Sequence, residues 1–166
     1  MNMKQLNTVM MSIGLGLGLT FSVTAMATDS HDVLQNQEAK GISTEQAIQL
    51  RQHAFVQIEN DAKQAGKALN NKQVDWEGLE QISQGLHESS VSLLSLFPDG
   101  SQEGSKAKQK VWNDKVKFER LLKEMDKGFE QLYQATINED KPSAQQGLKQ
   151  AQSTCKACHR QYRSRW

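Results

Sequence analysis

The stretch of sequence that decides the fold spans residues 113–135 and reads NDKVKFERLLKEMDKGFEQLYQA. Its large apolar residues recur every three or four positions, and charged residues fill most of the positions between them. This pattern predicts an amphipathic helix that begins near Asn113 or Asp114, either of which is a good N-cap, and ends near Ala135. The residues expected to face inward are Phe118, Leu121, Leu122, Met125, Phe129 and Leu132.

Three further segments have the same helical period, and no segment shows the alternation of a strand. We expect helices over Ser43–Leu69, over Asp75–Leu96 and from Pro142 to the C-terminus. A loop is expected over Pro98–Val111, where proline and glycine interrupt the pattern. Four amphipathic helices bury their apolar stripes most simply against one another. The predicted fold class is therefore all-α, an antiparallel four-helix bundle.

The first 27 residues differ from the rest of the chain. Lys4 precedes an apolar run over Val9–Val23, and Ala25 and Ala27 stand ahead of a polar segment. This arrangement is typical of a secretory signal peptide that is cleaved after Ala27. The alternative is an uncleaved anchor, but the run is shorter than the roughly 20 apolar residues that span a bilayer. We therefore expect a periplasmic protein with one mature domain over residues 28–166.

Length and charge narrow the function classes. A chain of 166 residues suits one domain, and its 20 basic residues nearly balance its 19 acidic residues. Loss of Lys4 with the signal peptide leaves a formally neutral chain, which has no general field to attract nucleic acid or an anionic membrane. Neither is expected as a partner. In an oxidising compartment, Cys155 and Cys158 are expected to form covalent bonds and not to remain free thiols.

A C-x-x-C-H motif over residues 155–159 is the part of the sequence that indicates a cofactor. Two thiols three residues apart on a helix can add to the two vinyl groups of one porphyrin. The motif thus predicts covalent haem c on Cys155 and Cys158, with His159 as the axial iron ligand. One alternative is a disulfide or a redox-active pair, although a redox pair normally lies near a βαβ pattern that this sequence does not show. Another is zinc, which would need a second Cys or His pair.

Four stretches spread along the chain form a combined pattern. They are Arg51-Gln52-x-Ala54-Phe55, Phe97-Pro98-Asp99-Gly100, Val111-Trp112 with Phe118, and the C-x-x-C-H motif followed by Tyr162-Arg163. This set resembles the cytochromes c′, four-helix-bundle haem proteins whose attachment motif lies near the C-terminus. The resemblance covers about Gln46–Arg163 and implies a bundle that encloses one haem c, bound through two thioethers.

The resemblance also implies roles for individual residues. The iron would be five-coordinate, with a crowded apolar distal face that admits NO or CO. Phe55 stands where a related electron-transfer branch has a methionine ligand, and phenylalanine cannot ligate iron. Arg51 would reach a haem propionate, and Arg163 would lie beside the axial histidine. Members of the family often form homodimers through their first two helices.

Four other residues could in principle supply a sixth iron ligand. Met125 is the only methionine outside the signal peptide, and its place in an apolar stripe predicts core packing. His53 lies two residues before Phe55 and is expected to face solvent when Phe55 faces the haem. His87 stands at the edge of the apolar stripe of its helix and is the rival that remains. His31 is expected to be solvated.

Two functions follow from these residues. The first is a haem protein that binds NO or CO and is capable of one-electron transfer, and the alternative is a six-coordinate electron-transfer cytochrome of the same fold. An enzyme would need acid–base groups on the distal side, where only Phe55 is expected, so no enzyme activity is predicted. A redox protein partner is suggested by the basic residues Lys156, Arg160, Arg163 and Arg165, although such clusters are often simply solvated.

Overall fold

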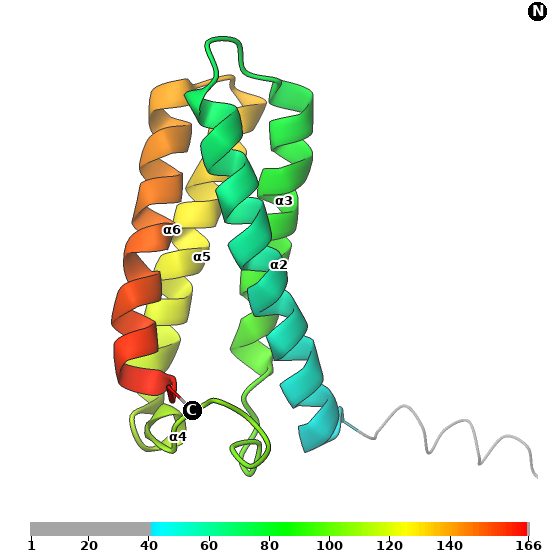
Figure 1. Ribbon diagram of the computed structural model, residues 1–166, viewed down its shortest axis with the longest axis vertical. Coiled ribbons are helices and arrows are strands. Elements are labelled where there is room, and N and C mark those ends of the chain that lie inside the picture. The colour runs from blue at the N-terminus through cyan, green and yellow to red at the C-terminus, as the bar shows by residue number, and fades with distance from the viewer. Residues whose placement is uncertain (1–40, 166) are drawn as a thin grey trace, which may run out of the picture. The chain divides into compact units, whose positions relative to one another are not determined.

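A computed structural model describes residues 41–165, so the predicted signal peptide and His31 lie outside the described residues. Four long helices run antiparallel to their neighbours and form a bundle (Figure 1). This arrangement confirms the predicted all-α fold. The helices are α2 (Thr44–Asn70), α3 (Trp76–Ser92), α5 (Lys115–Ile137) and α6 (Lys141–Tyr162), with a short 3-10 helix, η1 (Leu93–Ser95), and a short helix, α4 (Lys110–Asn113), in the connection between α3 and α5.

Local capping explains where the long helices begin. Ser43 forms a reciprocal capping box with Gln46 at the start of α2. The side chains of Asp75 and Asp140 accept hydrogen bonds from the backbone of Gly78 and Ser143, respectively, at the starts of α3 and α6. These starts lie within two residues of the predicted ones.

The segment between α3 and α5 differs from the prediction. The helix that was expected to continue to Leu96 tightens into η1 after Ser92. The expected loop over Pro98–Val111 ends in the additional helix α4, which the sequence pattern did not predict. A helix of one turn is too short to show a hydrophobic period.

The core is tightest between α5 and α6. A Cβ added at Gly128 would lie 2.5 Å from the backbone nitrogen of Ala151, and one added at Gly147 would lie 2.6 Å from that of Leu132. The two backbones therefore approach each other at a place where only glycine fits. Of the four pairs of neighbouring long helices, α2 and α6 contact each other least.

The buried face of α2 is less apolar than its sequence predicts. Arg51 and Asp61 are buried, whereas the large apolar residues Ile48 and Phe55 are only half-buried. Met125 is 5% exposed in the core, as expected. Among the helices that the structure describes, none combines the length and apolar character needed to cross a membrane.

Candidate functional site

The last turns of α6 carry the C-x-x-C-H motif. Cys155 and Cys158 are both half-buried free thiols, and Cys158 packs against the core. Burial raises the pKa of Cys158 to about 11, Cys155 adds to this shift, and burial also raises the pKa of Cys155. Both thiols are therefore protonated at neutral pH. Two thiols held on adjoining faces of one helix against an apolar surface fit the donor set that a porphyrin with two vinyl groups requires.

His159 follows the second cysteine and is exposed. Partial desolvation of its ring lowers its pKa, and the positive charge of Arg163 lowers it further. A neutral imidazole is the form that binds a metal ion. Arg163 lies one turn beyond His159 and is also exposed, so the structure places the two predicted residues together at the end of α6.

Helix α2 places Glu59 near this motif. The negative charge of Glu59 acts on the pKa of both Cys155 and His159, so its carboxylate lies within electrostatic reach of the motif. Phe55 lies one turn before Glu59 and therefore shares its side of α2. Sequence reasoning missed Glu59, although its spacing of four residues from Phe55 was a usable signal.

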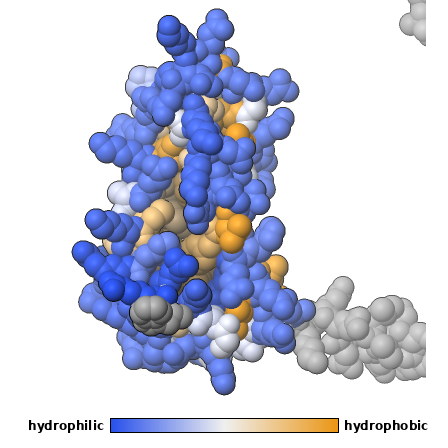
Figure 2. Space-filling view, in the orientation of Figure 1, coloured by the Kyte–Doolittle hydropathy of each residue, from blue (hydrophilic) through white to orange (hydrophobic). Residues whose placement is uncertain are grey.

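Aromatic rings extend from Phe55 into the bundle. Phe55 meets Phe97 edge-to-face at 6.4 Å between ring centroids, Phe97 meets Phe118 at 4.7 Å, and Phe118 meets Tyr162 at 5.2 Å. Apolar side chains are visible between α6 and α2 in a surface that is otherwise hydrophilic (Figure 2). Phe97 and Phe118 also line a cavity of about 220 Å³ together with Leu94, Val111 and Leu122. The motif thus lies beside an apolar, aromatic wall.

Arg51 contacts the aromatic wall and bonds the loop that follows α3. The guanidinium is 3% exposed and lies 4.7 Å from the centroid of the Phe97 ring. Nη1 donates to the carbonyl of Leu96 at 3.0 Å and to the hydroxyl of Ser101 at 2.7 Å, and Nη2 donates to the carbonyl of Ser101. Burial lowers the pKa of Arg51, and no carboxylate within residues 41–165 forms an ion pair with it.

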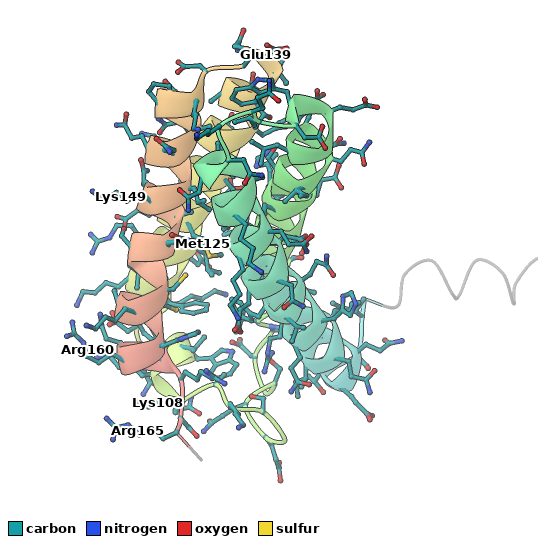
Figure 3. All side chains as sticks on the ribbon, turned by 45° about the horizontal axis from the view of Figure 1, so that its top comes forward. Lys108, Met125, Glu139, Lys149, Arg160 and Arg165 are labelled. Atoms are coloured by element: carbon teal, nitrogen blue, oxygen red, sulfur yellow. The ribbon has the colours of Figure 1, made fainter. Side chains whose placement is uncertain are left out.

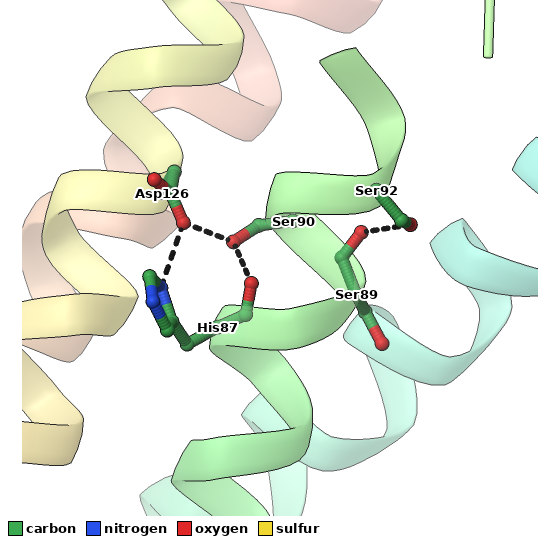
Figure 4. Close-up of polar contacts among 5 residues, drawn as sticks. All are labelled: His87, Ser89, Ser90, Ser92 and Asp126. Atoms are coloured by element: carbon green, nitrogen blue, oxygen red, sulfur yellow. Dashed lines mark hydrogen bonds and ion pairs between the residues drawn. The ribbon is translucent and has the colours of Figure 1, made fainter. Parts of the chain in front are cut away.

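The rival iron ligands lie elsewhere in the bundle. His53 is exposed, as expected. The Nδ1 atom of His87 lies 2.9 Å from Oδ1 of Asp126, which also accepts a hydrogen bond from the hydroxyl of Ser90 at 2.7 Å (Figure 4). This contact directs His87 toward α5. In the described part of the chain, no three or more His, Cys, Asp or Glu side chains are grouped so that they could hold a metal ion.

Comparisons with known proteins agree with this fold. The family model described as cytochrome C′ matches residues 46–163, whereas no curated protein sequence matches. Three solved structures illustrate the likeness. Cytochrome c prime from Shewanella frigidimarina is 24% identical, with a TM-score of 0.68 over 75% of this chain and 99% of that one.

The other two are more distant in sequence. A nitric oxide complex of a leucine-to-alanine mutant of cytochrome c prime from Alcaligenes xylosoxidans is 20% identical, with a TM-score of 0.69 over 76% of this chain and all of that one. A cytochrome c′ with an unusual ligand-controlled dimer dissociation is 16% identical, with a TM-score of 0.69 and the same coverage. These likenesses establish the fold, and the family match covers most of the sequence. The chain therefore belongs to the cytochrome c′ family, whose members bind haem c covalently.

Proposed function

We propose that Cys155 and Cys158 form the two thioether bonds to haem c and that His159 is the axial iron ligand. These are the only two cysteines in the chain, and both lie half-buried beside the aromatic wall. Bound haem supplies reversible binding of small gas molecules and one-electron redox chemistry. If the assignment holds, the exported Cys155→Ser/Cys158→Ser variant loses the haem-stained band after denaturing electrophoresis. An unchanged band contradicts the assignment.

The proposed function is the binding of NO or CO at a five-coordinate iron. Two observations support it. His53, His87 and Met125 lie in other environments, and Phe55 shares its side of α2 with Glu59, whose charge acts on the pKa of His159. The ring of Phe55 excludes water and bulky ligands, and it leaves diatomic molecules a path through side-chain movement. Phenylalanine has no acid–base group, and we therefore propose a binding protein that is not an enzyme.

The absorption spectrum of the exported ferrous protein, with and without CO, tests this function. A high-spin spectrum that shifts on addition of CO supports the five-coordinate site. The alternative, a six-coordinate electron-transfer cytochrome, predicts a low-spin ferrous spectrum that CO barely changes. The same measurement on His159→Ala checks the axial ligand, because that variant should lose the native ferrous spectrum.

Two arginines have supporting roles in the proposal. Arg51 is buried without a carboxylate partner, so a haem propionate is the anion that would balance its charge. Arg163 lies beside His159 and would stabilise the proximal side of the haem.

Export and assembly complete the proposal. Residues 1–27 are removed as a signal peptide, and the mature domain over residues 28–166 acts in the periplasm, where it exchanges electrons with a redox protein. The mass of the secreted protein tests the cleavage site. A homodimer through α2 and α3 is supported by large apolar side chains that these helices expose, among them Leu50 at 49% and Val91 at 44% exposure.

A further inference from the structure

Two segments that are distant in sequence join at the end of α6. The backbone N–H of Lys108 donates to the carbonyl of Tyr162, and the N–H of Ser164 donates to the carbonyl of Lys106, both at 2.8 Å. An antiparallel bridge between Ala107 and Arg163 lies between these bonds. Residues 106–108 and 162–164 are therefore fixed to each other as one surface.

This surface concentrates positive charge. We call it the basic end, and it comprises Lys106, Lys108, Lys110, Arg160, Arg163 and Arg165. Residues 104–113 and 141–165 contain no Asp or Glu. All six side chains are exposed except that of Lys108, which is half-buried, and none of the six takes part in an ion pair within the described residues. Figure 3 shows Lys108, Arg160 and Arg165 at one end of the molecule, with Glu139 near the opposite end.

The charge is local to this end. The whole chain has a formal net charge of only +1. Two carboxylates lie close to this end, since Asp114 accepts a hydrogen bond from Tyr162 and the charge of Arg163 acts on the pKa of Glu59, but neither forms an ion pair with the six basic side chains. Arg160 directly follows His159, which places the basic end next to the proposed haem site. A partner drawn to this charge would be oriented toward that site before it makes contact.

We propose that the basic end docks an acidic redox protein. The proposal rests on the electron-transfer part of the proposed function. A lipid surface is a poorer fit, because none of the large apolar side chains that the described residues expose lies within residues 104–113 or 156–165. Nucleic acid is a poorer fit because the chain as a whole is nearly neutral.

Two triple variants test the proposal. Lys106→Glu/Arg160→Glu/Arg165→Glu changes the basic end, and Lys72→Glu/Lys123→Glu/Lys149→Glu makes the same change in net charge at exposed positions elsewhere. The partner probe is an acidic blue-copper protein of the plastocyanin type. One electron leaves the reduced haem protein and converts Cu(II) to Cu(I), with no proton or bond exchanged.

At an ionic strength of about 10 mM, the basic-end variant should transfer its electron about tenfold more slowly than the wild type or the control variant. The difference should largely disappear at about 0.5 M salt, where screening is strong. Equal rates in the two triple variants would overturn the proposal. An unchanged CO spectrum in both variants shows that the gas site is intact, so failure of docking is distinct from failure of the gas-binding function.

A binding measurement decides the matter even if no electron is exchanged. Amide chemical shifts of the CO-bound haem protein should change in residues 104–110 and 156–165 when the Cu(I) probe is added, and should not change in the basic-end variant. Shift changes confined to another face contradict the proposal. Lipid binding is the other contrary outcome. If the wild type sediments with phosphatidylglycerol vesicles at about 0.1 M salt and does not bind the copper protein, the surface binds lipid and the proposal is wrong.

Discussion

At residue 55 a single ring separates the two candidate functions. Methionine is flexible and carries a thioether that ligates haem iron. We expect Phe55→Met to become largely six-coordinate and low-spin, with weaker CO binding because CO must displace the sulfur. Ferrous absorption spectra and CO titration measure both effects. The neighbouring Val56→Met is the control, because Val56 is 59% exposed and lies about 100° further around α2.

Removal of the same ring should have the opposite effect. Phe55→Ala opens the space over the iron, so CO should bind faster or more tightly in flash-photolysis measurements. Phe55 is half-buried, so the loss in unfolding free energy should fall below the roughly 3–5 kcal/mol typical of a fully buried phenylalanine. If neither substitution changes spin state or CO binding, Phe55 does not cover the iron.

Arg51 is the residue whose loss should most weaken the wall of the site. Arg51→Ala leaves the carbonyls of Leu96 and Ser101 without their buried donor. We expect the unfolding free energy to fall by about 3 kcal/mol in urea denaturation. Arg51→Lys should lose less, since it keeps the charge but not the planar fork. Arg120→Ala, at a side chain that is 68% exposed, should change it by less than about 0.5 kcal/mol. Equal losses at the two arginines would contradict this role.

At the scale of helices, the crossing of α5 and α6 depends on Gly128. Gly128→Ala places a methyl group where backbone atoms of Ala151 and Gly147 already lie, so the helices must separate. We expect a loss of at least about 2 kcal/mol in unfolding free energy. Gly66→Ala is the matched control, because its Cβ meets only a Leu148 methyl at 3.7 Å. It should stabilise the protein by up to about 1 kcal/mol, since alanine favours the helix. Similar effects at both glycines would refute the close crossing.

The start of α6 should respond to acid through Asp140. Hydrogen bonds from Ser143 lower the pKa of this N-cap carboxylate. Its contribution to stability is therefore complete above the unfolded pKa of about 3.9 and is lost as pH falls through the lower folded value. Asp140→Asn keeps a good cap without this titration. The melting temperature of the wild type should accordingly fall more steeply below about pH 4 than that of the variant. Parallel curves would contradict the assignment.

Sequence predicted the helices well where each carries its own signals. Ser43, Asp114 and Pro142 mark the starts of α2, α5 and α6 to within about a residue, and the apolar period marks their length. The same local signals could not predict α4, which is too short to show a period. They also missed the burial of Arg51, because its partners lie 45 to 50 residues away in a loop without a pattern.

The candidate site, like the helices, could be predicted from the sequence only where its residues are close together in the chain. The motif is local to α6, so its three residues could be read directly from the sequence. The expected position of Phe55 over the iron came from the family resemblance and remains a prediction. The pairing of residues 106–108 with 162–164 depends on tertiary contacts alone, so only half of the basic end could be foreseen. Long-range backbone pairing leaves no periodic trace in such a short segment.

For the whole molecule, these contacts imply that the cofactor stabilises one end of the bundle more than the other. The α5–α6 crossing at Gly128 is closely packed without haem, whereas α2 and α6 contact each other least and leave Phe55, Cys155 and Cys158 half-exposed. Bound haem should cover that apolar surface. The Cys155→Ser/Cys158→Ser apoprotein should therefore melt about 10 °C or more below the holoprotein.

The loss should also be uneven along the chain. Hydrogen exchange of the apoprotein, measured against the holoprotein in the same buffer, should show lost protection in residues 47–58 of α2 and 154–162 of α6. Residues 128–136 of α5 and 144–151 of α6 should stay protected, because their packing depends on the glycine crossing and not on haem. Uniform loss of protection would mean that the bundle folds as one unit around its cofactor. Unchanged protection would mean that α2 and α6 pack fully without it.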